Sequence, residues 1–108
     1  MKLWVDDVRP APEGYVWCKS VNNAILRIQA AEIPYFNHRD GADVDIISVI
    51  DIDHDAGDYA VFGGDYIRLL DWLEETGRNY PIRIHSQNPV GVANMRRIIE
   101  RNGWKEVF

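Results

Sequence analysis

The run DIISVIDI at residues 45–52 restricts the fold more than any other part of the sequence. It is almost continuously apolar and rich in β-branched side chains, whereas a strand with one face in water alternates apolar and polar residues. Such a run is typical of a central strand in a parallel sheet that is covered on both faces. Asp51 lies next to the end of this run and Asp53 follows it directly. The sequence thus places negative charge at the end of what should be the most buried strand.

Strand and helix signals alternate along the rest of the chain. Ser20 is a good N-cap residue, and Asn88 followed by Pro89 is typical of a helix start. The sequence predicts helices over 21–32, 65–76 and 89–102, and strands over 2–5, 15–18, 45–52, 81–86 and 104–108. Right-handed crossovers then predict an α/β fold, a parallel sheet with helices on both faces.

Size and charge limit the function classes. The 108 residues suit one domain, 1–108, and no apolar run approaches the ~18 residues that a membrane span needs. The net charge of −5 argues against bulk binding to duplex nucleic acid but allows a small phosphorylated ligand. The single cysteine, Cys18, and the absence of a signal-peptide pattern predict a soluble, cytoplasmic protein without a membrane partner.

Acidic side chains gather where the predicted strands end. Asp6 and Asp7 follow the first strand, and Asp53 and Asp55 follow the third, with Asp51 two residues before Asp53 on the same face. The carboxyl ends of parallel strands meet at one edge, which is where such sheets bind ligands. We expect Asp6, Asp7, Asp53 and Asp55 to hold a divalent metal, Mg²⁺ or Mn²⁺, with Asp51 behind them. The alternative is that these aspartates cap turns.

Two histidines lie at strand ends that should adjoin. His54 follows Asp53, and His85 ends the fourth predicted strand. Together with Asp53 they are the predicted catalytic residues, as general acid and base or as softer metal ligands. His54 reaches the site only if the chain turns after Asp53, and His38 in the loop over 35–43 has no assigned role.

A phosphate seat is predicted beside the fourth strand. Ser86, Asn88 and the first turn of the last helix offer donors to an anion. Arg9 can pair either with a phosphate or with a neighbouring carboxylate.

Three blocks of the sequence resemble the cyclic-phosphate processing receiver domains, a divergent group of receiver domains. The blocks are LWVDDVRPAPEGYVW (3–17), DIDHDAGDYA (51–60) and IRIHSQNPVGVANMRRII (82–99). The resemblance implies a flavodoxin-like three-layer sandwich with strand order 2-1-3-4-5, in which the first and last helices are reduced or missing. By position it implies a metal-binding pair at Asp6 and Asp7, a phosphoacceptor-like Asp53 and a fourth-strand hydroxyl at Ser86.

Two functions are compatible with these residues. One is a metal-dependent phosphoesterase that processes a cyclic phosphate of a nucleotide or an RNA end. The other is a non-catalytic receiver-like module that binds a phosphorylated ligand or a protein partner in signalling. Both need the same metal and phosphate seats, so the sequence leaves open whether the protein is an enzyme.

Overall fold

The computed structural model describes residues 1–33 and 46–108. His38 and the loop around it lie outside the described residues, as does Asp45 at the predicted start of the third strand. The chain contains, in order, β1 (Lys2–Val5), β2 (Tyr15–Cys18), α1 (Val21–Glu32), β3 (Val49–Ile52), the 3₁₀ helix η1 (Gly57–Phe62), α3 (Ile67–Glu75), β4 (Ile82–Ile84) and α4 (Pro89–Asn102).

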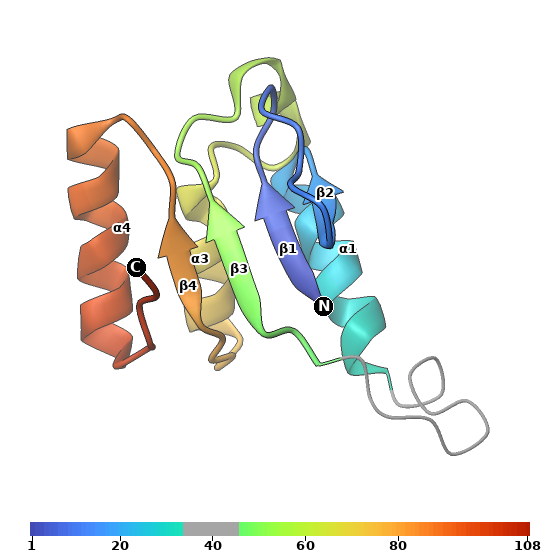
Figure 1. Ribbon diagram of the computed structural model, residues 1–108. Helices are drawn as coiled ribbons and strands as arrows, with labels where there is room; N and C mark the ends of the chain where they lie inside the picture. The colour runs from blue at the N-terminus through green and yellow to red at the C-terminus, as the bar shows by residue number, and fades with distance from the viewer. Residues whose placement is uncertain (34–45) are drawn as a thin grey trace.

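The sheet is parallel throughout and its four strands lie in the order β2-β1-β3-β4 (Figure 1). This is the predicted order without its fifth member. The segment after α4 forms only an isolated bridge between Ile82 and Glu106. Glu106 is held instead by the side chain of Arg96, and Trp104 turns into the core. The prediction of a fifth strand over 104–108 is therefore not confirmed, because this segment pairs with β4 at one residue only.

Local capping signals place the helices. Ser20 accepts a hydrogen bond from the backbone N–H of Asn23, so α1 begins where the sequence predicts. The helix also ends at the predicted residue, Glu32. Asn88 caps α4 in the same way, through the N–H of Gly91. Helix α3 is shorter than predicted, because Asp65 accepts the N–H of Ala56 instead of entering the helix.

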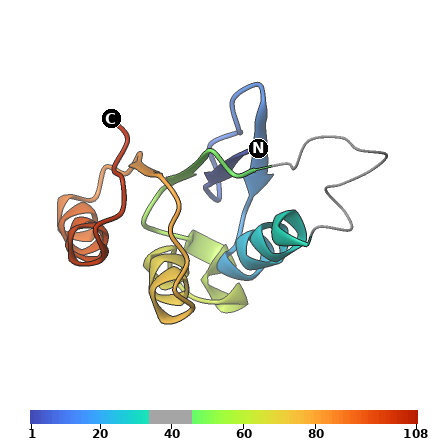
Figure 2. The same ribbon diagram turned by 90° about the horizontal axis from the view of Figure 1, so that it is seen from below.

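The helices of the described residues form one layer. Helix α3 packs against both α1 and α4, and Figure 2 shows α1 and α3 on the same side of the sheet, with α4 beyond α3 toward the β4 edge. The connection between β1 and β2 contains no helix. The predicted second helical layer of a three-layer sandwich is not found among residues 1–33 and 46–108, where a strand buried on both sides is covered by helices on one face only. None of the described helices has the length and apolar character that crossing a membrane requires.

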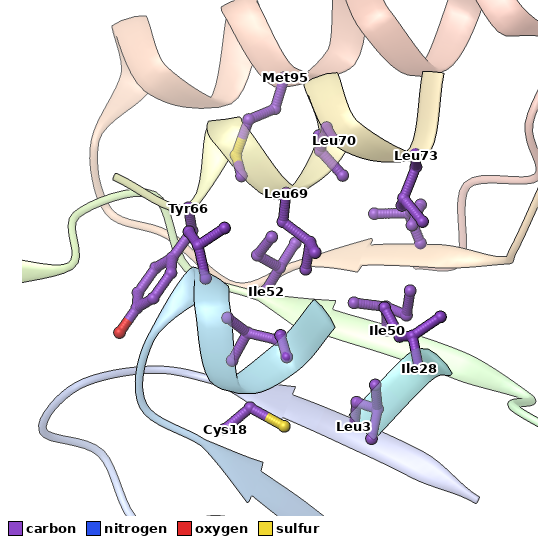
Figure 3. Close-up of a cluster of buried hydrophobic side chains, with 14 of the residues drawn as sticks. Leu3, Cys18, Ile28, Ile50, Ile52, Tyr66, Leu69, Leu70, Leu73 and Met95 are labelled. Atoms are coloured by element: carbon purple, nitrogen blue, oxygen red, sulfur yellow. The ribbon is translucent and has the colours of Figure 1, made fainter. Parts of the chain in front are cut away.

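The strands present two faces with different contents. Leu3, Val5, Ile50 and Ile52 face the helices, where they pack with apolar side chains from α1, α3 and α4 (Figure 3). Trp4 and Asp51, which lie between these residues, point the other way and are both buried, and the half-exposed Arg83 of β4 pairs with Asp51 on that face. The helix-covered face thus carries the core, and the opposite face leads toward the strand-end site.

Candidate functional site

The ends of β1 and β3 bring two aspartates side by side. The N–H of Asp53 donates to the carbonyl of Val5 at 2.9 Å, and the N–H of Asp6 donates to the carbonyl of Cys18 at 3.2 Å. These bonds continue the parallel ladder one residue beyond the strands. Asp6 and Asp53 therefore occupy neighbouring positions at the carboxyl edge, on the face that also carries Trp4 and Asp51.

His85 completes this group from β4. Its N–H donates to the carbonyl of Ile52 at 2.9 Å, which keeps it in register with Asp53. Within the described ranges, Asp6, Asp53 and His85 each offer one ligand atom, and these atoms lie within 4.8 Å of one another. Two carboxylates and an imidazole at that spacing can share one divalent cation. We call Asp6, Asp53 and His85 the strand-end cluster.

The imidazole of His85 is fixed on three sides. Its Nε2 lies 2.9 Å from Oδ2 of Asp6, and its Nδ1 lies 2.6 Å from Oδ1 of Asp51. The ring stacks on Trp4 with centroids 3.8 Å apart and an angle of 4° between the planes. Arg83 donates to the other oxygen of Asp51 at 3.0 Å. Asp51 thus orients Nδ1 and leaves Nε2 facing the carboxylates, as outer carboxylates do for histidine ligands of metals.

Asp6 is held as an acceptor by the turn that follows it. Its Oδ1 accepts the N–H groups of Val8 and Arg9, each at 2.9 Å. Burial by itself would raise the pKa of Asp6, but these backbone hydrogen bonds and the contact with His85 outweigh it and hold the pKa below its ordinary value. The side chain is fully buried yet kept in the ionised form that a metal ligand needs.

Asp7 lies close to the carboxylates of Asp6 and Asp53, and its own ionised form is disfavoured there. Burial raises its pKa, and the nearby carboxylates of Asp6 and Asp53 raise it further. Its side chain lies against the Cα of Gly57, which has φ of +54°, so a Cβ at position 57 would collide with the carboxylate. A third carboxylate so close to two others favours binding of a cation, because a cation relieves the mutual repulsion.

His54 and Asp55 form a separate group near the start of α4. Nδ1 of His54 lies 2.8 Å from Oδ1 of Asp55, and the side-chain amide of Asn88 is 3.4 Å from both of these atoms. The ring packs on the Cα of Gly91, where a Cβ would overlap it. The chain does turn after Asp53, since the His54 N–H donates to Oδ1 of Asp53 at 2.7 Å, but the turn carries the imidazole to α4.

The predicted phosphate-binding residues have partners within the protein. Ser86 Oγ accepts the N–H of Asn88 at 3.2 Å and retains its own proton for donation. Arg9 donates to the carbonyl of His85 at 2.9 Å and lies 3.9 Å from Asp6. Arg9 thus adopts the carboxylate-pairing alternative, although its side chain is 42% exposed and its guanidinium keeps further donors for a ligand.

The structure therefore sorts the predicted site residues into two neighbouring groups. Asp6, Asp53 and His85 converge, with Asp7 and Arg9 beside them. His54, Asp55 and Asn88 form the second group, at the start of α4. The sequence reasoning missed the role of Trp4 as the stacking partner of His85. The signal for it was period 2, since Trp4 stands two residues before Asp6 on the same face of β1.

A parallel α/β sheet with acidic residues at the ends of its first and third strands defines a receiver-like domain. The sequence profile of the cyclic-phosphate processing receiver domain family matches residues 1–101, and the chain belongs to that family. Comparisons with curated proteins and with solved structures found no match.

Proposed function

We propose that this domain is a metal-dependent phosphoesterase that opens a cyclic phosphate on a nucleotide or an RNA end. The observation that carries the proposal is the strand-end cluster, in which two carboxylates and an oriented imidazole share one small volume. Membership of a cyclic-phosphate processing family supports the substrate class.

Asp6, Asp53 and His85 are the residues that would hold the metal, with Asp7 beside them. A bound divalent cation neutralises phosphate oxygens and lowers the pKa of a coordinated water. The nitrogen of His85 suits Mn²⁺ better than Mg²⁺, which prefers oxygen ligands only. At equal concentrations, we expect Mn²⁺ to raise the melting temperature more than Mg²⁺ does.

The two histidines then have different duties. His85 is occupied at both nitrogens by carboxylate oxygens, which suits a ligand better than a group that exchanges protons. His54 is fixed by Asp55 through Nδ1, and no hydrogen bond to its Nε2 occurs within the described part of the chain. Nε2 of His54 is therefore the nitrogen we assign to proton transfer, with Ser86 donating to the phosphate.

The test is release of 2′- or 3′-monophosphate from nucleoside 2′,3′-cyclic phosphates in the presence of MnCl₂ or MgCl₂. Asp53→Asn removes a ligand of the cluster and should abolish turnover. Asp58→Asn is the matched control, because Asp58 is an exposed acid five residues further along the same segment. Turnover by the wild type that does not exceed that of Asp53→Asn would sink the proposal.

One observation favours the second candidate, a non-catalytic module that binds a phosphorylated ligand. The His54 ring packs against α4, and the strand-end cluster itself contains only His85, whose nitrogens are both engaged. A binding module predicts that a cyclic nucleotide raises the melting temperature in the presence of metal without being consumed. Product formation at any rate above that of Asp53→Asn excludes a purely binding role.

A further inference from the structure

A pocket of about 330 Å³ opens between the end of β2, the start of α1 and the helix η1. Three aromatic and three polar side chains line it: Trp17, Tyr59, Phe62, Lys19, Ser20 and Asn23. We call it the aromatic pocket. Neither the predicted metal site nor the predicted phosphate seat uses any of these residues.

One wall of the aromatic pocket is hydrogen-bonded to the backbone of the strand-end cluster. The indole N–H of Trp17 donates to the backbone carbonyl of Asp6 at 2.7 Å. The helix η1 begins at Gly57, against the carboxylate of Asp7, and the glycine that follows η1, Gly63, lies against Asn22 of α1. Figure 1 shows the segment between β3 and α3 at the same end of the sheet as the carboxyl ends of β1 and β2. The pocket is therefore built partly on the same segments that carry Asp6 and Asp7.

The lining is suited to a flat, polar ring. Phe62 is 53% exposed, although it belongs to a class of side chain that folding normally buries, and its ring lies 6.3 Å from that of Tyr59. The ammonium of Lys19 stands 4.4 Å from the centre of the Trp17 ring. Aromatic faces combined with a cation and side-chain hydrogen-bonding groups are what proteins use to bind nucleobases.

We propose that the aromatic pocket is the subsite for the base of a nucleoside 2′,3′-cyclic phosphate whose phosphate lies at the strand-end cluster. This inference rests on the proposed function for the placement of the phosphate. It adds that the domain recognises a nucleotide by its base and not by the cyclic phosphate alone. Phe62 and Tyr59 supply the stacking surface, and Lys19 pairs with ring oxygen or nitrogen acceptors.

The experiment compares two cyclic esters in the presence of MnCl₂. Adenosine 2′,3′-cyclic phosphate has a base, and glycerol 1,2-cyclic phosphate does not. Phe62→Ala removes one stacking face and should weaken binding of the adenosine ester about tenfold, as measured by calorimetry. Binding and turnover of the glycerol ester should be unchanged. Val61→Ala is the matched control, because Val61 is 79% exposed on the same 3₁₀ helix and does not line the pocket.

The outcomes separate this inference from the proposed function. If neither ester is hydrolysed but Phe62→Ala still weakens binding of the adenosine ester, the base subsite stands and the phosphoesterase falls. If the adenosine ester does not bind, or if Phe62→Ala affects both esters equally or neither, the subsite is overturned whatever the turnover. An equal loss in Val61→Ala would overturn it as well, because the effect would then belong to η1 as a whole.

Discussion

Asp51→Asn tests whether the oriented imidazole serves a metal. The substitution keeps the shape of a fully buried side chain. It removes the negative charge of the carboxylate that accepts hydrogen bonds from His85 and Arg83. A hydrogen bond to a charged group contributes about 1.5–3 kcal/mol, and the half-exposed Arg83 pair at most about 1 kcal/mol. Removing a buried charge returns part of its desolvation cost. The expected loss is therefore about 1–2 kcal/mol, or roughly 5–15 °C in melting temperature.

The metal response of this variant is the sharper measurement. Loss of an outer carboxylate typically weakens metal affinity about 10- to 100-fold. At a MnCl₂ concentration near 100 times the wild-type Kd, metal stabilises the wild type by about 2.7 kcal/mol. A variant with roughly 30-fold weaker affinity gains only about 0.9 kcal/mol. The metal-induced rise in melting temperature should thus be about three times smaller in Asp51→Asn than in the wild type.

Differential scanning fluorimetry with and without MnCl₂ measures both effects, and titration calorimetry gives the metal Kd. Arg83→Gln is the control, because it removes the exposed partner of Asp51 and leaves the contact with His85 intact. Its metal-induced rise should equal that of the wild type. If Asp51→Asn is destabilised but shows the full metal-induced rise, Asp51 supports the fold alone and the assignment of His85 as a ligand is refuted.

Three further predictions concern other contacts. Gly91→Ala should lower the melting temperature, because the new Cβ overlaps the His54 ring. Alanine in a helix is normally about 1 kcal/mol more stable than glycine, so a higher melting temperature would contradict this packing. Glu32→Gln should cost about 1 kcal/mol at pH 7. Arg78 holds the pKa of Glu32 below its ordinary value, so this contribution is present above pH 4.5 and is lost as the pH falls through the lowered pKa. In urea titrations the difference from the wild type should shrink as the pH is lowered below 4.5. Asp7→Asn should raise the melting temperature of the metal-free protein near neutral pH, because it relieves repulsion among three carboxylates, and the gain should shrink as the pH falls through the raised pKa of Asp7; an unchanged value at pH 7 would contradict the crowding.

Local signals in the sequence were sufficient for most of the elements. Ser20 and Asn88 fix their helix starts through short-range hydrogen bonds that depend on few other residues. The convergence of Asp6 and Asp53 followed from strand direction alone, since parallel strands end at one edge. Period 2 also placed Asp51 on the face of Asp53, behind the site.

Long-range packing decided what the sequence could not. The direction of His54 depends on a turn and on the space that Gly91 leaves in α4, and no periodic signal reports either. The aromatic pocket depends on η1, a 3₁₀ helix of six residues too short for a recognisable pattern. The burial of Trp4 and Asp51 on the other sheet face was likewise hidden, because within the described residues His85 packs on them there and no helix does.

The alternation along the strands separates folding from chemistry within the same few residues. Positions 3, 5, 50 and 52 supply the core, whereas positions 4, 6, 51 and 53 supply the strand-end cluster and its supports. Every second residue can therefore be exchanged to alter which ion or ester is bound while the apolar set between them stays as it is. The two sets are not energetically independent, because Trp4, Asp6 and Asp51 are buried and a change at any of them alters stability as well as the site.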